Sequence, residues 1–278
     1  MKISENKRKI KLLVSDLDGT LLNSKKEISP ANLQTLKKCQ SKNIIIAVAT
    51  GRPLFKAKEF IKNLELEKTN GYLISYNGAL ITECKTDKIL FSSFIPKDIV
   101  KKILDKTTEM QVPIIFYDDK TGNIFTNKLN QKSDLVTLIE KGENKLTKIY
   151  EGEIPENLCT IEVLFNTENK NKILNELIHE FPNLEIIESF YFGLTITNKG
   201  IDKANAIDHL RKIFKINVEE ICAFGDNFND ASMIKYCGIG VAMGNANDDI
   251  KKMADFVSVD NENDGVAYAI KKLGIIDN

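Results

Sequence analysis

The chain has 278 residues, of which 42% are hydrophobic and 28% are charged. This length suits one large domain or two modest ones, and the composition is that of an ordinary globular protein. The 39 basic residues balance the 39 acidic ones, so net charge favours neither nucleic acid nor an anionic membrane as a partner. No apolar run reaches the length of a membrane span and no signal-peptide core is present, so we expect a cytoplasmic protein. The five scattered cysteines form no Cys-x-x-Cys pair, which argues against a disulfide framework or a zinc–thiolate site.

The first predicted strand lies within residues 10–22 and leads into two acidic residues. Its apolar run is typical of a buried strand in a parallel sheet. Asp16 and Asp18 follow the run, with one residue between them. Open α/β sheets bind ligands at this end of their strands, and two carboxylates placed there need a cation or hydrogen-bond donors. Taken alone, the pair also fits an ordinary polar turn.

Strands and helices alternate through the rest of the N-terminal part. The pattern predicts a helix over residues 30–41, a strand over 44–49, a helix over 53–63 and a strand over 72–75. The strand over 44–49 ends at Thr50, Gly51 and Arg52. Such alternation indicates a parallel sheet with helices on both faces.

The middle of the chain contains more strands and fewer intervening helices. This pattern is typical of an α+β domain rather than a doubly wound sheet. We predict strands over residues 89–95, 114–117, 124–126, 160–165, 184–187 and 192–197, and helices over 97–110, 130–141 and 168–181.

Alternation resumes towards the C-terminus. A helix over residues 202–215 precedes a strand over 220–224, which ends at the acidic loop 225–230. A second strand over 239–242 and further helices complete the pattern. We therefore predict an α/β fold: a Rossmann-like, doubly wound parallel-sheet core formed by residues 1–82 and 191–278, interrupted by an α+β domain formed by residues 83–190.

The strand ends of this core carry residues that suit phosphate chemistry. Because the carboxyl ends of parallel strands meet at one edge of a sheet, we expect their side chains to share a crevice. Carboxylates can hold a hard divalent cation such as Mg²⁺. A hydroxyl, a glycine backbone and a lysine can hold a phosphate. The residues concerned are Asp16, Asp18, Thr50, Gly51, Lys203, Asp226, Asn229 and Asp230.

The same residues form a set of motifs in a fixed order. The set resembles the haloacid dehalogenase superfamily, and specifically its Cof-type phosphatases with a large α/β cap. Lys203 fits the third motif better than Lys199, because Ala204-Asn205-Ala206-Ile207 follows it. The four motifs are Asp16-Leu17-Asp18-Gly19-Thr20-Leu21, Thr50-Gly51-Arg52, Lys203 and Gly225-Asp226-Asn227-Phe228-Asn229-Asp230, and the resemblance extends to Asn77-Gly78-Ala79 and to residues 240–246.

This resemblance implies a Mg²⁺-dependent phosphatase that acts through an aspartyl-phosphate. Asp16 would attack the phosphorus, and Asp18 would protonate the leaving oxygen and then activate water. The Mg²⁺ ligands would be Asp16, Asp226 and the backbone carbonyl of Asp18, with Asp230 orienting the metal shell. The inserted domain would be the cap.

The phosphate contacts implied by the resemblance come from four residues. Thr50, Gly51, Lys203 and Asn229 would bind the phosphoryl oxygens of a small-molecule phosphomonoester. The family hydrolyses sugar phosphates, other small metabolites and some cofactor phosphates, and the sequence does not choose among them. We expect a monomer or a weak homodimer.

Other classes of protein fit less well. A dinucleotide-binding oxidoreductase needs Gly-x-Gly-x-x-Gly after the first strand, whereas the nearest run, residues 238–244, is one residue too long and follows the fifth core strand. A phosphomutase of the same superfamily shares the motifs and stays open. A catalytically silent binding module also stays open, although the intact Asp16, Asp18, Lys203 and Asp226 argue against it.

Overall fold

The computed structural model describes residues 9–128, 148–149, 154–164, 169–189 and 193–276. The chain divides into two compact units. The first, called here the core unit, contains residues Met1–Arg52, Ala57–Phe91 and Asp202–Asn278. The second, called here the inserted unit, contains residues Pro53–Lys56 and Ser92–Ile201.

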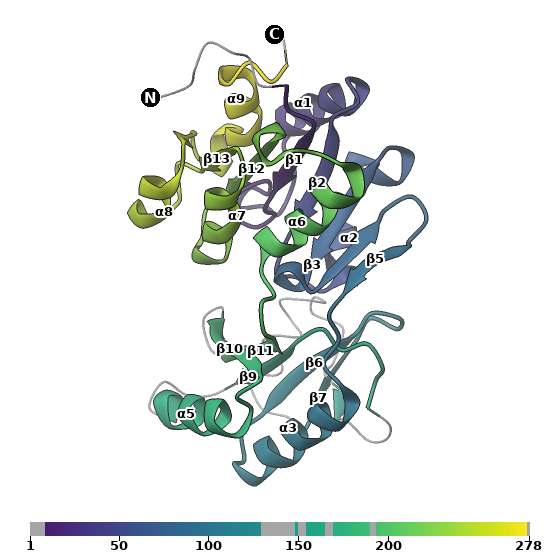
Figure 1. Cartoon of the computed structure of the whole chain (residues 1–278), viewed down its shortest axis with the longest axis vertical. Helices are drawn as coiled ribbons and strands as arrows, with labels where there is room; N and C mark the ends of the chain where they lie inside the picture. Colours follow the sequence, from purple (N-terminus) through teal and green to yellow (C-terminus); the bar gives the residue numbers. More distant parts are fainter. Residues whose placement is uncertain (1–8, 129–147, 150–153, 165–168, 190–192, 277–278) are drawn as a thin grey trace. The chain divides into compact units, whose positions relative to one another are not determined.

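The core unit is built on an eight-stranded sheet in the order β14-β13-β12-β1-β2-β3-β4-β5. β1 occupies a central position between β12 and β2 and is parallel to both (Figure 1). All four residues of β1 are buried, as the apolar run predicts for a strand covered on both faces. The strands are β1 (Leu12–Ser15), β2 (Ile45–Ala49), β3 (Gly71–Ser75), β4 (Leu80–Glu83), β5 (Ile89–Ser92), β12 (Ile221–Gly225), β13 (Ile239–Ala242) and β14 (Phe256–Val257).

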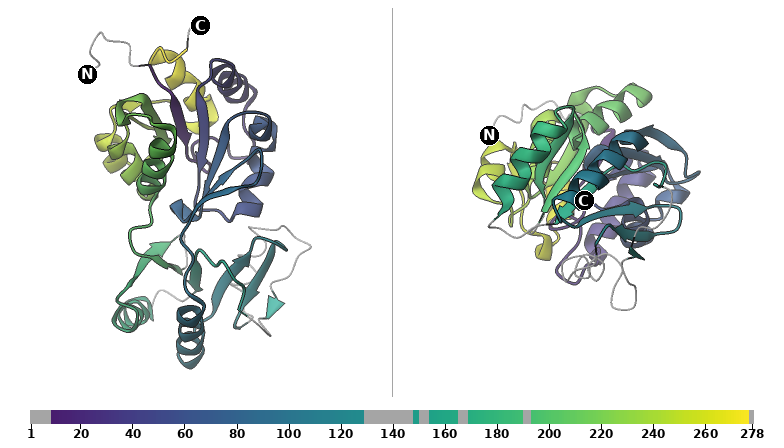
Figure 2. Two further views of the ribbon diagram at one scale, coloured as in Figure 1. Left: turned by 45° about the vertical axis from the view of Figure 1, so that its right-hand side comes forward. Right: turned by 90° about the horizontal axis from the view of Figure 1, so that it is seen from below.

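Helices cover both faces of this sheet, with α6 and α7 on one face and α1 on the other (Figure 2). Residues of α6 and α7 pack on alternate residues of the central strands, among them Leu12 and Val14. Sequence signals fix the helix ends: Ser29 caps α1 by accepting the N–H of Asn32, and Asp202 caps α6 by accepting that of Asn205. The helices are α1 (Pro30–Ser41), α2 (Leu54–Ile61), α6 (Lys203–Phe214), α7 (Ala231–Tyr236), α8 (Asp248–Met253) and α9 (Gly265–Lys272).

The order of the strands creates a switch point between β1 and β12. From β1 the chain adds β2 and β3 on one side, and after the insertion it adds β12 and β13 on the other. Helices that leave two neighbouring strands in opposite directions open a crevice at their carboxyl ends, which is where α/β sheets bind ligands. The predicted Asp16 and Asp226 stand at these two ends.

The inserted unit has a six-stranded sheet in the order β10-β11-β9-β6-β7-β8. Its own hydrophobic cluster joins the sheet to two helices and includes the buried Phe116, so it has a separate core. The elements are α3 (Lys97–Glu109), β6 (Ile114–Asp118), β7 (Asn123–Thr126), β8 (Lys148–Ile149), β9 (Ile161–Leu164), α5 (Lys170–Glu180), β10 (Leu184–Ser189) and β11 (Gly193–Asn198).

The inserted unit begins and ends later in the chain than we predict: its main segment is Ser92–Ile201, whereas we predict residues 83–190. β5 extends the core sheet through β4, although we predict the insertion from residue 83. β11 pairs with β9 and β10 in the inserted unit, although we predict the core from residue 191. The strands themselves were predicted, but the partners of a strand are set by long-range packing. The predicted helix over residues 130–141 lies outside the described residues.

Two further observations concern the cysteines and the helices. All five cysteines are free. Among the residues that the structure describes, no helix is both long enough and apolar enough to cross a membrane.

Candidate active site

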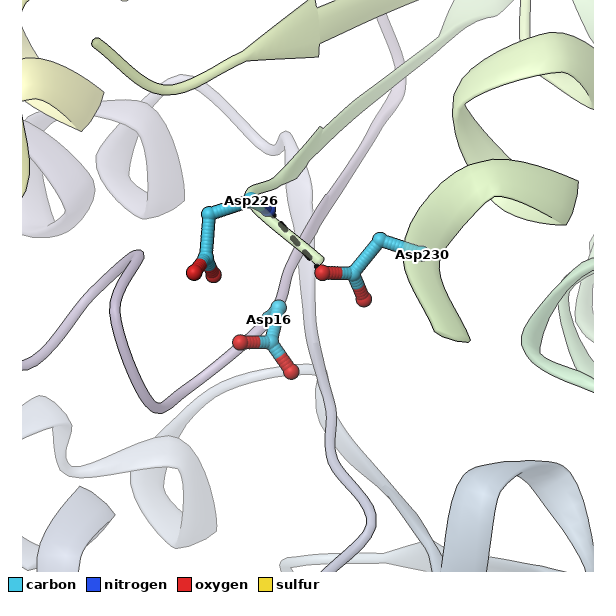
Figure 3. Close-up of side chains that lie close together, drawn as sticks. All are labelled: Asp16, Asp226 and Asp230. Atoms are coloured by element: carbon cyan, nitrogen blue, oxygen red, sulfur yellow. Dashed lines mark hydrogen bonds between the residues drawn. The ribbon is translucent and has the colours of Figure 1, made fainter. Parts of the chain in front are cut away.

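Three carboxylates meet where β1 and β12 end. Asp16 follows β1, Asp226 follows β12, and Asp230 immediately precedes α7. One carboxylate oxygen from each lies within 4.8 Å of the others, and Figure 3 shows the three side chains turned towards one another. Asp16 and Asp230 are buried, with exposed fractions of 5% and 0%. Gathering three like charges at a buried point destabilises the fold unless cations or donors offset them.

Lys203 supplies one of these offsetting charges. It is the first residue of α6 and its side chain is fully buried. Its Nζ lies 2.5 Å from Asp16 Oδ1 and 2.6 Å from Asp230 Oδ1. A helix N-terminus is an unfavourable place for a cation, so the two carboxylates are what stabilise the ammonium group there.

Burial and neighbouring charges raise the pKa values of Asp16, Asp226 and Lys203, although burial acts in opposite directions on the acids and on the base. Burial is the main cause that raises the pKa of Asp16 well above its usual range; the neighbouring Asp230 adds to it and Lys203 opposes it. Burial also raises the pKa of Asp226, to about 6. For Lys203, burial lowers the pKa, but the two carboxylates outweigh it and the net shift is upward. The cluster has three carboxyl groups and one lysine, so ionising all three carboxyl groups would leave negative charge that the lysine does not offset.

Asp230 and Asp226 differ in how many of their oxygens the protein already uses. Asp230 Oδ1 accepts from Lys203, and its Oδ2 accepts the backbone N–H groups of Asp226 and Asn227, both at 3.0 Å. Asp226 Oδ1 accepts from the Thr20 hydroxyl at 2.8 Å. Asp226 Oδ2 has no partner among the described residues, so Asp226 is the better of the two as a ligand for a cation.

This donor set suits a hard divalent cation. Mg²⁺ takes oxygen ligands at about 2.0–2.1 Å, commonly one or two carboxylates together with substrate oxygens and water. Asp16 and Asp226 provide such oxygens close together, and the surplus negative charge favours a cation at this point. The described residues place no histidine or cysteine in the cluster, which would have favoured a softer metal.

Gly19 is needed where the chain turns after the acidic pair. Its φ of +77° is in the left-handed region, and a Cβ there would lie 2.4 Å from Asp226 Oδ2. Any other residue would strain the backbone and push the Asp226 carboxylate out of place. The turn therefore brings the loop after β1 against the loop after β12.

Asp18 is not part of the acidic cluster in this structure. Its carboxylate pairs with Arg52, through Nε at 2.6 Å and Nη2 at 2.9 Å, and with Lys26 Nζ at 2.7 Å. Burial raises the pKa of Asp18, but these hydrogen bonds and charges outweigh it and hold the pKa below its usual value. Arg52 in turn lies over the ring of Phe60, 4.7 Å from its centroid. Asp18 is thus held as a carboxylate.

The predicted phosphate-binding residues lie on the neighbouring loops of the core unit. Thr50 follows β2 and is buried, and its Oγ1 accepts the N–H of Arg52 at 3.1 Å, which leaves the hydroxyl proton for a ligand oxygen. Gly51 is exposed. Asn229 is also exposed, and its Nδ2 donates to Asn77 Oδ1 at 3.0 Å.

The sequence interpretation gave no role to four residues that contact this site. Thr20 holds Asp226, and Lys26 holds Asp18. Asn77 accepts from Asn229. Asn245 Nδ2 donates to the carbonyl of Gly19 at 2.8 Å. Thr20, Asn77 and Asn245 lie in stretches that carry the family resemblance. Lys26 lies in none of them, and its contact with Asp18 depends on the turn of the chain that follows Leu22.

The fold and the acidic cluster are those of a haloacid dehalogenase-like hydrolase. The chain matches the haloacid dehalogenase-like hydrolase family over residues 13–270, and it belongs to that family. Similarity to known phosphatases and to solved subclass IIB structures identifies it as a Cof-type phosphatase.

Among its relatives, a 5-amino-6-(5-phospho-D-ribitylamino)uracil phosphatase of Bacillus subtilis is 32% identical over 268 residues, covering 94% of this chain and 95% of the relative. A haloacid dehalogenase-like hydrolase from Bacteroides thetaiotaomicron has a similar crystal structure, with a TM-score of 0.86 and 31% identity over 95% of this chain and 100% of its own. A subclass IIB sugar phosphatase gives a TM-score of 0.79 at 27% identity, over 96% and 100% of the two chains.

Proposed function

We propose that this phosphatase uses Mg²⁺ and an aspartyl-phosphate on Asp16 to hydrolyse small phosphorylated metabolites. The observation that supports this most strongly is the placement of the Asp16 carboxylate. It is buried, within 2.5 Å of Lys203 Nζ and close to two further carboxylates. Such a carboxylate is fixed in orientation and can act as a nucleophile once the surrounding charge is offset.

The phosphoryl group would be held by groups of the core unit. Asp16, Asp226 and the backbone carbonyl of Asp18 would hold Mg²⁺, which when bound would draw charge from the phosphoryl oxygens. The Thr50 hydroxyl, the Gly51 backbone and the Lys203 ammonium would bind the same oxygens, with Asn229 donating its amide. Asp230 would act through Lys203 and the loop after β12, since both its oxygens are already occupied.

Two displacements at phosphorus would complete the reaction. An oxygen of Asp16 would bond to the phosphorus as the ester bond breaks, and Asp18 would give its proton to the leaving oxygen. A water oxygen would then attack the phosphorus while Asp18 takes its proton, and the bond to Asp16 would break to release inorganic phosphate. Arg52 and Lys26 hold Asp18 in its ionised form, which is the form the second displacement needs; the first needs the carboxyl protonated and thus freed from these cations.

For the substrate, we propose phosphomonoesters of sugars or polyols. The names of two relatives point to this class, because one acts on a phosphorylated ribityl chain and another is a sugar phosphatase. In such esters the leaving group is an alkoxide, a poor leaving group that requires a proton. The need for Asp18 follows from that chemistry. Cytoplasmic location and a monomer or weak homodimer stay predictions.

Release of free phosphate from a panel of sugar and polyol phosphates tests this function. We expect activity with Mg²⁺, and none from Asp16→Asn. Asp105→Asn, on the exposed side of α3, is a matched control that should keep full activity. A product that is an isomeric phosphate ester, with no free phosphate, would instead indicate a phosphomutase. Full activity of Asp16→Asn would exclude the proposed nucleophile.

A further inference from the structure

The turn after β3 has an unusual backbone. It forms the short 3₁₀ segment Tyr76–Gly78, in which Tyr76 and Asn77 both have φ near +53° and Gly78 has φ of +112°. Left-handed φ is uncommon for residues other than glycine, and for a bulky residue such as Tyr76 it is an outlier. Strain of this kind persists only where the surroundings impose it, and it is often found at functional sites.

Backbone contacts show what imposes this conformation. The N–H of Tyr76 donates to the carbonyl of Arg52 at 3.2 Å, and that of Asn77 donates to the carbonyl of Thr50 at 3.0 Å. On the other side of the turn, a Cβ on Gly78 would lie 2.3 Å from the carbonyl oxygen of Asp202. The turn is therefore packed between the Thr50 loop and the N-terminus of α6, which carries Lys203.

The side chain of Asn77 reaches a third part of the site. Its Oδ1 accepts from Asn229 Nδ2 at 3.0 Å. The Asn77 amide also lies close to Gly51, because a Cβ built on Gly51 would be 3.1 Å from Asn77 Nδ2. Asn77 thus touches both the glycine and the amide to which the proposed function assigns phosphate binding, although the two are far apart in sequence.

We propose that Asn77 is a positioning residue for phosphoryl binding and that it acts through Asn229; this rests on the proposed function. Asn229 is exposed, so its side chain would sample several rotamers without a partner. One N–H of its amide is fixed by Asn77 Oδ1, which leaves the other N–H in a defined direction for a phosphoryl oxygen. Preorganised donors bind a developing charge better than mobile ones, because the ordering is already complete before the reaction.

The variant that isolates this side chain is Asn77→Gly. Glycine adopts left-handed φ without strain, so the turn should be kept while the amide is lost. Asn43→Gly is the matched control, because Asn43 is an exposed asparagine of the core unit with φ of +61° and lies outside the site. Asn77→Asp keeps the acceptor oxygen and tolerates the backbone, but places a charge beside Gly51.

Steady-state kinetics on p-nitrophenyl phosphate, with inorganic phosphate as a competitive inhibitor, provide the readouts. Asn77→Gly should lower kcat/KM about two- to tenfold, the scale of one hydrogen bond, and weaken inhibition by phosphate. Asn77→Asp should weaken phosphate inhibition at least as much, because its carboxylate repels the dianion. Asn43→Gly should match the wild type in both.

A double-mutant cycle with Asn229→Ala then tests whether Asn77 acts through Asn229. We expect the double variant to be no worse than Asn229→Ala alone, because the positioned amide is already gone. Independent, additive losses would overturn this route, and unchanged kinetics and phosphate inhibition in Asn77→Gly would overturn the role itself. Should Asn77→Gly fail to fold, Asn77→Ala and its double variant with Asn229→Ala decide in the same way, because alanine also lacks the acceptor oxygen. An inactive wild type would instead count against the proposed function.

Discussion

Removing the buried cation of the acidic cluster should destabilise the core unit strongly. Lys203 is fully buried between Asp16 and Asp230, with N–O distances of 2.5 and 2.6 Å. In Lys203→Met the two carboxylates keep their burial and lose their partner. Breaking a buried pair in this way costs about 3–5 kcal/mol in the free energy of unfolding, or about 6–20 °C in Tm for a unit of this size.

The loss should grow with pH. Burial and the neighbouring carboxylates already raise the folded-state pKa of Asp16, and Lys203 opposes this shift. Without Lys203, the pKa of Asp16 should rise further above its unfolded value. A carboxyl group shifted in that direction contributes stability at low pH and loses it as the pH rises through the folded-state pKa. The deficit in Tm should therefore be larger at pH 8 than at pH 5.

Differential scanning calorimetry in the presence of a chelator measures these differences. Lys199→Met is the matched control, because Lys199 is exposed and should unfold as the wild type does. Asp230→Asn, added to Lys203→Met, should restore part of the lost stability by removing one buried charge. If Lys203→Met unfolds at the wild-type temperature at pH 8, the charge balance inferred for this cluster is incorrect.

Three further outcomes are expected. Chelation should abolish activity and Mg²⁺ should restore it, whereas Ca²⁺ should bind and support little turnover because its looser coordination misplaces the nucleophile; full activity after chelation would exclude a metal. Asp18→Asn should give a burst of p-nitrophenol followed by slow turnover, and a loss of about 10²–10⁴-fold on a sugar phosphate, and equal losses on both substrates without a burst would exclude Asp18 as the acid–base group. Replacing residues 93–200 with a short linker should leave a folded core, because each unit has its own hydrophobic cluster, but should change the ranking of substrates; an unchanged ranking would show that the inserted unit does not select them.

Much of the core could be predicted because its signals are local. The apolar runs of β1, β2 and β12 are short, bounded by turn residues and buried on both faces, so composition alone indicates parallel strands. Parallel strands place their carboxyl ends together. This rule alone predicts that Asp16 and Asp226 lie close together.

What the sequence did not reveal depends on long-range contacts. The sequence of β11 predicts a strand but does not indicate which strands it pairs with. Its place in the inserted sheet, beside β9, therefore could not be predicted. The pairing of Asp18 with Arg52 and Lys26 depends on rotamers and on the turn between residues 22 and 28. Asn77 reads as an ordinary turn residue, and only the fold brings it to Asn229.

The covalent intermediate on Asp16 is the central claim, and peptide mass mapping tests it directly. The wild type and Asp18→Asn are mixed with Mg²⁺ and p-nitrophenyl phosphate, quenched in acid and digested. We predict the added mass of one phosphoryl group on the peptide that contains Asp16, more abundant in Asp18→Asn because its hydrolysis lacks a base, and none in Asp16→Asn. A phosphoryl group on another residue, or turnover by Asp16→Asn at the wild-type rate, would contradict the account.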